Sequence, residues 1–211
     1  MLEYRLVAFD LDGTLLQGEP SWSLLHRYFG TLDKAEKAHE MYIKGEISYE
    51  QFMYTDLSLW PKPLHRSTLE SILLKAKLRP EAKYVVEKLK KAGMKIAIVT
   101  AALDLLANRI GKLLNVDFVY SNKIGFDERG YYDGKVYPLV EPLKKDLILK
   151  SLASNLSIDL RNTIAVGDNV QDESFLRIAG LSFVIGDRKL AQKIEAVYIE
   201  DLREILDYLK L

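Results

Sequence analysis

The chain has 211 residues, of which 48% are hydrophobic and 28% are charged, with 30 lysines and arginines against 30 aspartates and glutamates. This length suits one large domain, or one domain with an insertion. The zero net charge gives no electrostatic attraction to nucleic acid or to an anionic membrane, and the lack of cysteine excludes disulfides and thiolate metal sites.

The N-terminal residues, the hydropathy of the chain and the spacing of its histidines argue against a secreted protein, a membrane protein and a zinc site. The first residues lack the pattern of a signal peptide, and no apolar stretch approaches the length of a membrane span. The three histidines, His26, His39 and His65, show no zinc-type spacing. We therefore expect a soluble, cytoplasmic protein, a monomer or homodimer, that binds neither nucleic acid nor membrane.

The N-terminal third of the chain predicts one strand and then only helices. The apolar residues 6–9 predict a buried strand. Helices are expected at residues 21–29 and 33–44, and two further helices are expected to open with capping boxes at residues 48–51 and 67–70. This pattern predicts a helical cap domain at residues 18–78, inserted into a core formed by residues 1–17 and 79–211.

Strands and helices alternate in the rest of the chain. Strands are expected at residues 95–100, 116–121, 163–167, 182–185 and 196–199, and helices at 80–92, 103–114, 144–156, 173–179 and 201–209. Turn signals between aromatic residues predict a hairpin or flap at residues 125–136. Continuous apolar strands that alternate with helices predict an α/β fold with a Rossmann-like parallel sheet and right-handed crossovers.

Polar residues follow three of the predicted strands. The first strand ends in Asp10-Leu11-Asp12-Gly13-Thr14, the strand at 95–99 in Thr100, and the strand at 163–167 in Asp168, with Asp172 close behind. Two adjacent carboxylates disfavour each other's ionisation unless a cation or a reaction requires both, although an Asp-rich turn would look the same. Because active sites of open α/β sheets lie at the carboxyl ends of the strands, these residues together predict a metal-assisted phosphate site.

These motifs resemble the haloacid dehalogenase superfamily, and within it the phosphoserine-phosphatase-like subgroup with a helical cap after the first strand. The remaining motif is a lysine at a helix start, Lys145 or Lys144. Lys145 is preferred because its spacing from Asp168 is the one expected from relatives. The resemblance implies a Mg²⁺-dependent phosphomonoester hydrolase that forms an aspartyl-phosphate and acts on a small phosphorylated metabolite.

Charge and the resemblance together imply a role for each residue. Asp10 would be the nucleophile and Asp12 the general acid and base. Mg²⁺ would be held by Asp10, the Asp12 backbone carbonyl and Asp168, with Asp172 behind them. The residues expected to bind the phosphate are Thr100, Ala101 and Lys145, and those expected to contact the rest of the substrate are Glu19 and Gln171.

The cap departs from the subgroup's pattern. Glu19 matches the glutamate that binds a substrate ammonium, but the arginine expected to bind the substrate carboxylate does not appear. The corresponding segment, residues 52–57, contains Asp56 and no basic residue, so that only Arg27 or Arg66 could replace the arginine, and only in a cap folded differently. A carboxylate substrate would be repelled by Asp56, which predicts that phosphoserine is a poor substrate.

Two other functions were weighed against the hydrolase. A phosphomutase or phosphotransferase of the same superfamily would differ in excluding water from the intermediate. A receiver-like phospho-acceptor domain also places an aspartate, a threonine and a lysine at strand ends, but it lacks a carboxylate two residues after the acceptor and has no helical insertion.

Overall fold

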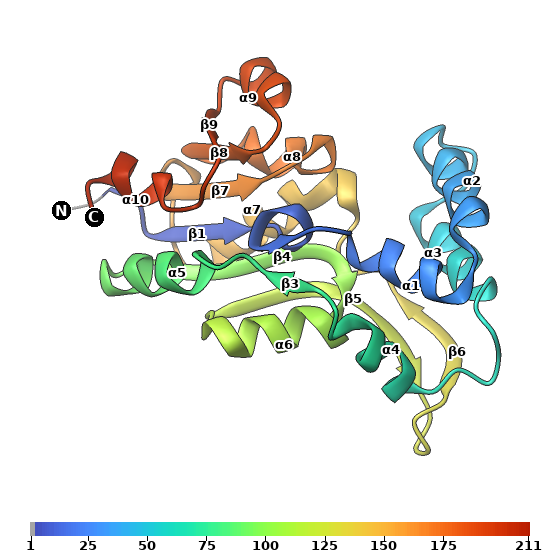
Figure 1. The fold of residues 1–211 in the computed structure, drawn as a ribbon. Helices are drawn as coiled ribbons and strands as arrows, with labels where there is room; N and C mark the ends of the chain where they lie inside the picture. The colour runs from blue at the N-terminus through green and yellow to red at the C-terminus, as the bar shows by residue number, and fades with distance from the viewer. Residues whose placement is uncertain (1–2) are drawn as a thin grey trace.

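The computed structural model describes residues 3–211 and contains a seven-stranded sheet in the order β6-β5-β4-β1-β7-β8-β9 (Figure 1). All neighbouring strands are parallel except β5 and β6, which are antiparallel. The strands are β1 (Leu6–Phe9), β4 (Lys95–Leu103), β5 (Phe118–Phe126), β6 (Tyr132–Tyr137), β7 (Thr163–Gly167), β8 (Leu181–Ile185) and β9 (Val197–Ile199). The predicted α/β fold with a parallel sheet is confirmed.

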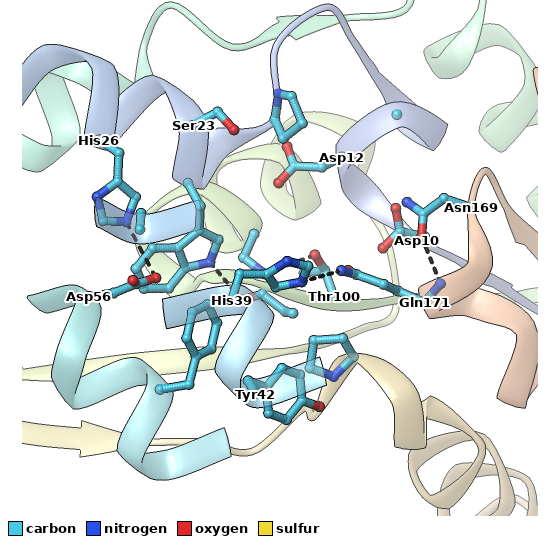
Figure 2. A pocket seen from close by; sticks show the side chains of 18 of the residues that line it. Asp10, Asp12, Ser23, His26, His39, Tyr42, Asp56, Thr100, Asn169 and Gln171 are labelled. Atoms are coloured by element: carbon cyan, nitrogen blue, oxygen red, sulfur yellow. Dashed lines mark hydrogen bonds and ion pairs between the residues drawn. The ribbon is translucent and has the colours of Figure 1, made fainter. Parts of the chain in front are cut away.

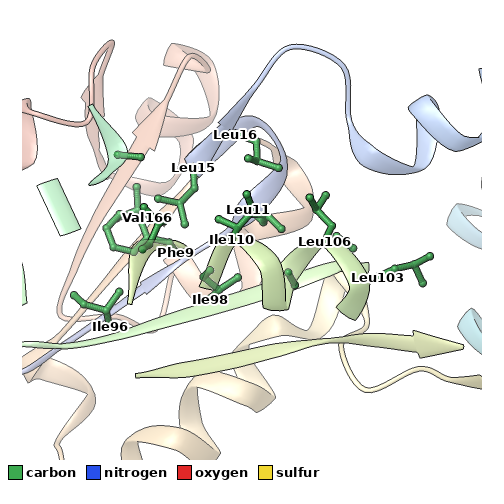
Figure 3. Packing of buried hydrophobic residues seen from close by; sticks show 14 of the residues in the cluster. Phe9, Leu11, Leu15, Leu16, Ile96, Ile98, Leu103, Leu106, Ile110 and Val166 are labelled. Atoms are coloured by element: carbon green, nitrogen blue, oxygen red, sulfur yellow. The ribbon is translucent and has the colours of Figure 1, made fainter. Parts of the chain in front are cut away.

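Strand β1 lies at the centre of the sheet because all four of its residues are apolar. Leu6 pairs with Lys95 on β4 and with Thr163 on β7, and the whole strand is completely buried. Side chains alternate between the two faces. Val7 and Phe9 pack into one apolar cluster (Figure 3), and Leu6 and Ala8 pack into another.

Helices cover both faces of the sheet. The first cluster contains side chains of α5 (Ala82–Lys91), α6 (Asp104–Leu114) and α10 (Glu204–Leu209), and the second contains side chains of α7 (Lys145–Asn155), α8 (Glu173–Leu176) and α9 (Arg188–Ile194). Because helices cover both faces of the sheet, both sides of each central strand are buried and the strand sequences are continuously apolar. No helix within residues 3–211 combines the length and apolar character needed to cross a membrane.

The segment expected to form the cap holds four helices. They are α1 (Ser21–Phe29), α2 (Leu32–Ile43), α3 (Tyr49–Ser58) and α4 (Arg66–Leu73), and the first three lie beyond the carboxyl ends of the central strands (Figure 1). The chain leaves the core through β2 (Leu16–Gln17) and returns through β3 (Lys77–Leu78), and these two strands pair with each other. The two segments that connect residues 18–76 to the rest of the chain therefore lie side by side.

Helix starts were predicted with mixed success. The capping box at α3 is confirmed, because Ser48 Oγ accepts from the Gln51 amide (3.2 Å) and Gln51 Oε1 from the Ser48 amide (2.8 Å). The second capping box is wrong: α4 starts at Arg66, and the ring of His65 accepts from the Ser67 amide (3.2 Å). Helix α9 was missed, because seven residues carry too little periodicity to detect.

The predicted hairpin is present as β5 and β6, and its tip packs against the connection between α3 and α4. The Tyr132 amide donates to Leu64 O (2.8 Å), and the Arg66 amide donates to Gly130 O (2.8 Å). The hairpin therefore supports the cap from the core side.

Candidate active site

The turn after β1 holds Asp10 and Asp12 in a fixed loop. The Asp10 amide donates to Val166 O on β7 (2.9 Å), and Leu11 and Leu15 anchor the turn in the apolar core (Figure 3). Arg79 donates from Nε to Thr14 O and from Nη2 to Gly13 O, both at 2.8 Å. The backbone of the turn is thus fixed at both ends and in its middle.

Gly13 is required at this turn for two reasons. Its φ of +86° lies in the left-handed region, which side chains disfavour. A Cβ there would also lie 2.1 Å from Asp168 Oδ2. The glycine therefore lets the carboxylate of Asp168 approach the loop that carries Asp10 and Asp12.

Lys145 is the cation at the centre of the site. It is the first residue of α7 and is 3% exposed, and its Nζ donates to Asp10 Oδ1 (2.5 Å) and to Asp172 Oδ1 (2.6 Å). Lys144 is exposed instead and pairs with Glu141 (3.0 Å). Of the two candidate lysines, the structure places Lys145 beside Asp10.

Asp172 organises the loop after β7. It is completely buried, and its Oδ2 accepts from the amides of Asp168 (2.9 Å) and Asn169 (3.4 Å). Because its Oδ1 accepts from Lys145, one carboxylate links the loop to the lysine. Gly167 makes this possible, since a Cβ there would lie 2.6 Å from the Asp172 side chain.

The site contains more negative charge than its lysine can balance. Oxygens of Asp10, Asp168 and Asp172 all lie within 4.8 Å of one another. Burial and the charge of Asp172 raise the pKa of Asp10 well above its usual range, and the same two causes raise the pKa of Asp168 to about 7. Three crowded carboxylates with one ammonium group fit a divalent cation, and their hard oxygens suit Mg²⁺.

Asp12 occupies a different environment from this cluster. Its Oδ2 accepts from Ser21 Oγ at 2.5 Å, and Ser21 is the first residue of the cap helix α1. Burial raises the pKa of Asp12, and the hydrogen bond from Ser21 opposes this shift. The side chain of Asp12 is therefore positioned by the cap, whereas that of Asp10 is positioned by the core.

Thr100 and Ala101 lie where β4 passes the site. Thr100 is 2% exposed, and its Oγ1 accepts from the Ala102 amide (3.1 Å). Ala101 O accepts from Trp22 Nε1 on α1 (3.1 Å) and from Asn122 Nδ2 (3.0 Å). Asn122 also donates to Tyr49 Oη on α3 (2.7 Å), so two cap helices are connected to this loop.

A cavity of about 420 Å³ joins these residues to the cap (Figure 2). The core contributes one wall, which includes Asp10, Asp12, Thr100, Ala101, Lys145 and Asp168. The cap contributes a wall rich in aromatic rings, which includes Trp22, His26, His39, Tyr42, Phe52 and the carboxylate of Asp56. The carboxylates of the core therefore face aromatic rings of the cap across this cavity.

Known proteins share this arrangement over most of the chain. The family described as haloacid dehalogenase-like hydrolase matches residues 4–180. The chain belongs to this hydrolase family. The match assigns it to hydrolases rather than to the receiver-like domains considered from the sequence.

Individual relatives in the family match nearly the whole of this chain. A phosphoserine phosphatase of Methanocaldococcus jannaschii is 29% identical over 98% of both chains. One of Archaeoglobus fulgidus is 28% identical over 99% of this chain, which spans 61% of that protein. A solved structure described as a phospho-aspartyl intermediate analogue of phosphoserine phosphatase is 29% identical, with a TM-score of 0.80 over 97% of this chain and 98% of its own.

The structure separates the two residues expected to contact the rest of the substrate. Gln171 lines the cavity, and its Nε2 lies 3.4 Å from His39 Nε2 on α2. Glu19 is not among the lining residues and pairs with the exposed Arg27 (2.7 Å). Contact between Glu19 and a substrate stays a prediction, with Arg27 as the competing partner.

Neither arginine considered for the missing carboxylate-binding role lies in the cavity wall. Arg27 pairs with Glu19, and Arg66 pairs with Glu70 on the surface of α4 (2.8 Å). The hairpin at residues 125–136 also contributes no lining residue among those that the structure describes. Among the described residues, the cavity is therefore lined by the helices of residues 18–78 and not by the hairpin.

Sequence reasoning missed Ser21 and the pairing of His26 with Asp56. Ser21 has a weak signal, because a serine at a helix start is usually interpreted as a cap. His26 and Asp56 belong to different helices, and only the packing of α1 on α3 brings them to 3.3 Å. No local pattern could have indicated either contact.

Proposed function

We propose that the protein is a Mg²⁺-dependent phosphomonoester hydrolase that forms an aspartyl-phosphate on Asp10 and acts on a small phosphorylated metabolite. The proposal rests mainly on one observation: two carboxylates line the same cavity but are held by different hydrogen-bond partners. Asp10 is fixed by Lys145 (2.5 Å), and Asp12 is fixed separately by Ser21 (2.5 Å). Paired carboxyl groups in different environments can perform nucleophilic and acid–base roles side by side.

The first half of the reaction transfers the phosphoryl group to the protein. A carboxylate oxygen of Asp10 attacks phosphorus, and the bond from phosphorus to the leaving oxygen breaks. Asp12 gives its proton to that oxygen, so the alcohol leaves neutral. The Thr100 hydroxyl, the Ala101 amide and Lys145 stabilise the charge on the phosphoryl oxygens.

The second half returns Asp10 to its starting state. Asp12, now ionised, accepts a proton from a water molecule, whose oxygen attacks phosphorus. The bond between phosphorus and Asp10 breaks, inorganic phosphate leaves and Asp12 is protonated again. The same carboxyl group therefore acts first as an acid and then as a base.

The carboxylate cluster supports a metal requirement. Asp10, Asp168 and the Asp12 backbone carbonyl would hold Mg²⁺, and Asp172 would orient Lys145 and the loop. The bound ion would supply positive charge for the phosphate oxygens and offset the crowded carboxylates. Burial and the charge of Asp172 raise the pKa of Asp168 to about 7, so a cation at this position would favour its ionised form.

A direct assay tests the proposal. Hydrolysis of p-nitrophenyl phosphate is measured with Mg²⁺ and with excess chelator, and phosphate release is compared with transfer to an added alcohol. Release of phosphate to water that depends on Mg²⁺ supports the hydrolase. Transfer to the alcohol without release would indicate the phosphotransferase instead.

The cytoplasmic location and the monomeric or homodimeric state stay predictions. Cell fractionation tests the location, and size-exclusion chromatography tests the oligomeric state.

A further inference from the structure

The cap wall of the cavity contains a buried carboxylate, Asp56 on α3. Asp56 is 3% exposed and lines the cavity. Its Oδ2 lies 3.3 Å from Nε2 of His26, which is also buried. Its Oδ1 is buried without a hydrogen-bond partner among the described residues. In Figure 2 this pair lies on the opposite side of the pocket from Asp10.

His26 does not neutralise Asp56. Trp60 Nε1 donates to His26 Nδ1 at 3.1 Å, and an indole nitrogen can only donate. Nδ1 therefore accepts this bond, and it also lies 2.9 Å from Thr31 Oγ1. The ring proton then lies on Nε2, which is 3.3 Å from Asp56 Oδ2 but makes no hydrogen bond of good geometry. A ring protonated at Nε2 alone brings no positive charge to the carboxylate.

No other cation near Asp56 compensates its charge. Among the described residues, no lysine or arginine lies within ion-pair distance of its carboxylate, and Lys145, the cation in the cavity wall, is occupied by Asp10 and Asp172. Burial raises the pKa of Asp56, and this effect outweighs the opposing influence of His26 and His39. The second charged group that the cap contributes to the wall is another carboxylate, Glu36.

Aromatic rings surround this carboxylate side of the cavity. Trp22 lies over His26, with ring centroids 6.2 Å apart, and Tyr42 and Phe52 stack with centroids 5.5 Å apart. Aromatic faces attract cations, and a buried carboxylate without a counter-charge is costly. A positively charged group in the cavity would interact favourably with the aromatic faces and would compensate the charge of Asp56.

We propose that the leaving group of the substrate carries an ammonium group that binds Asp56, so that the substrates are phosphate monoesters of amino alcohols. This inference rests on the proposed phosphatase function. No arginine lines the cavity among residues 3–211, and a leaving group without a carboxylate needs none. Asp56 then determines specificity without taking part in phosphoryl transfer.

Three matched esters test the inference on the unmodified protein. Phosphoethanolamine and 2-hydroxyethyl phosphate differ in the ammonium group, and phosphoethanolamine and phosphoserine differ in the carboxylate. We expect kcat/KM for phosphoethanolamine to exceed that of each other ester by about tenfold or more, which corresponds to ~1.4 kcal/mol. Asp56→Asn should reduce its advantage over 2-hydroxyethyl phosphate by a similar factor. Asp33→Asn, at an exposed cap position outside the cavity, should leave the ratio unchanged.

The outcomes separate this inference from the proposed function. If p-nitrophenyl phosphate is not hydrolysed with Mg²⁺, the phosphatase assignment itself fails. If it is hydrolysed but the three esters react equally, or phosphoserine reacts fastest, the inference is overturned and the phosphatase stands. A melting curve checks that the Asp56→Asn variant is folded. If the variant is unfolded, the comparison of the three esters on the unmodified protein tests the inference by itself.

Discussion

Lys145 is the residue on which the charges of the site converge. It joins Asp10 to Asp172, and all three side chains are buried. Removing one partner of such a group leaves a buried charge uncompensated, which is more costly than losing a surface pair. Asp10 and Asp12 nevertheless depend on different neighbours, so their proposed roles can be tested one at a time.

Asp10→Asn should abolish phosphate release and leave the fold intact, because an amide cannot attack phosphorus and keeps the shape of the side chain. Asp12→Asn should reduce kcat by ~10²–10⁴, the range for loss of a general acid and base. Phosphate release from p-nitrophenyl phosphate and from an alkyl phosphate measures both effects. Asp207→Asn, at an exposed position of α10, serves as the control. Near-normal turnover by Asp10→Asn would refute its role as the nucleophile.

Ser21 should act as a positioning residue through Asp12. Ser21→Ala removes the hydroxyl that donates to Asp12 Oδ2, so kcat for an alkyl phosphate should decrease by about tenfold or more. An aryl phosphate should be affected less, because its leaving oxygen needs little protonation. Ser21→Thr returns a hydroxyl and should restore most of the alkyl activity. An equal loss on both esters, without rescue by threonine, would indicate a structural role only.

At the scale of elements, the strands that end in the site were predictable and the contacts between elements were not. Residues 6–9, 95–99 and 163–167 are continuous apolar runs, and each is a strand whose end reaches the cavity. Helix α4 begins at Arg66 and is capped by His65, and histidine is not a common N-cap residue, so the sequence did not indicate this start. The contact of Ser21 with Asp12 depends on how the cap lies on the core, which no local periodicity encodes.

The carboxylate cluster is formed by two loops that follow β1 and β7, and it predicts metal dependence. Excess chelator should remove hydrolysis of p-nitrophenyl phosphate, and added Mg²⁺ should restore it. Ca²⁺ should inhibit, because its larger and looser coordination shell disturbs the alignment of nucleophile and phosphate. Full activity in excess chelator would exclude a metal at Asp10 and Asp168.

Asp117 joins β4 to the start of β5 and should make stability depend on pH. Burial alone would raise its pKa, but hydrogen bonds from the Ile96 amide (2.9 Å) and Lys95 (3.2 Å) lower it below its usual value. A depressed pKa adds stability above the pKa of the unfolded chain, and this stability is lost as pH decreases through the folded value. Asp117→Asn should therefore cost about 1 kcal/mol at neutral pH.

The cost of Asp117→Asn should begin to decrease as the pH falls below ~4, the pKa of the unfolded chain, and should disappear below the lower pKa of the folded protein, where its carboxylate is also protonated. Urea unfolding of both proteins across this pH range measures the difference. Glu40→Gln removes an exposed pair with Lys44 (3.6 Å) and should change stability little at any pH. A cost that is independent of pH would show that the charge of Asp117 is not the cause.

At the scale of the whole molecule, cap and core share the site. Ser21 contacts Asp12, Trp22 contacts Ala101, Tyr49 contacts Asn122 and His39 contacts Gln171, and in each pair the cap residue is named first. The core residues of these pairs lie near the phosphate end of the cavity, whereas the cap supplies the aromatic wall and Asp56. The core is therefore expected to recognise phosphate and the cap to recognise the alcohol.

Replacing the cap with a short turn should separate these two tasks. Strands β2 and β3 pair with each other, Gln17 opposite Lys77, so an Asn-Gly turn can join them as a hairpin when residues 18–76 are removed. We expect the remaining protein to hydrolyse p-nitrophenyl phosphate, because Asp10, Lys145 and Asp168 all belong to the core. Its kcat/KM for alkyl phosphates should decrease further, since Ser21 no longer holds Asp12, and its discrimination among them should vanish. Circular dichroism and a cooperative melting curve verify folding, and unchanged discrimination among alkyl esters would show that the cap does not select the substrate.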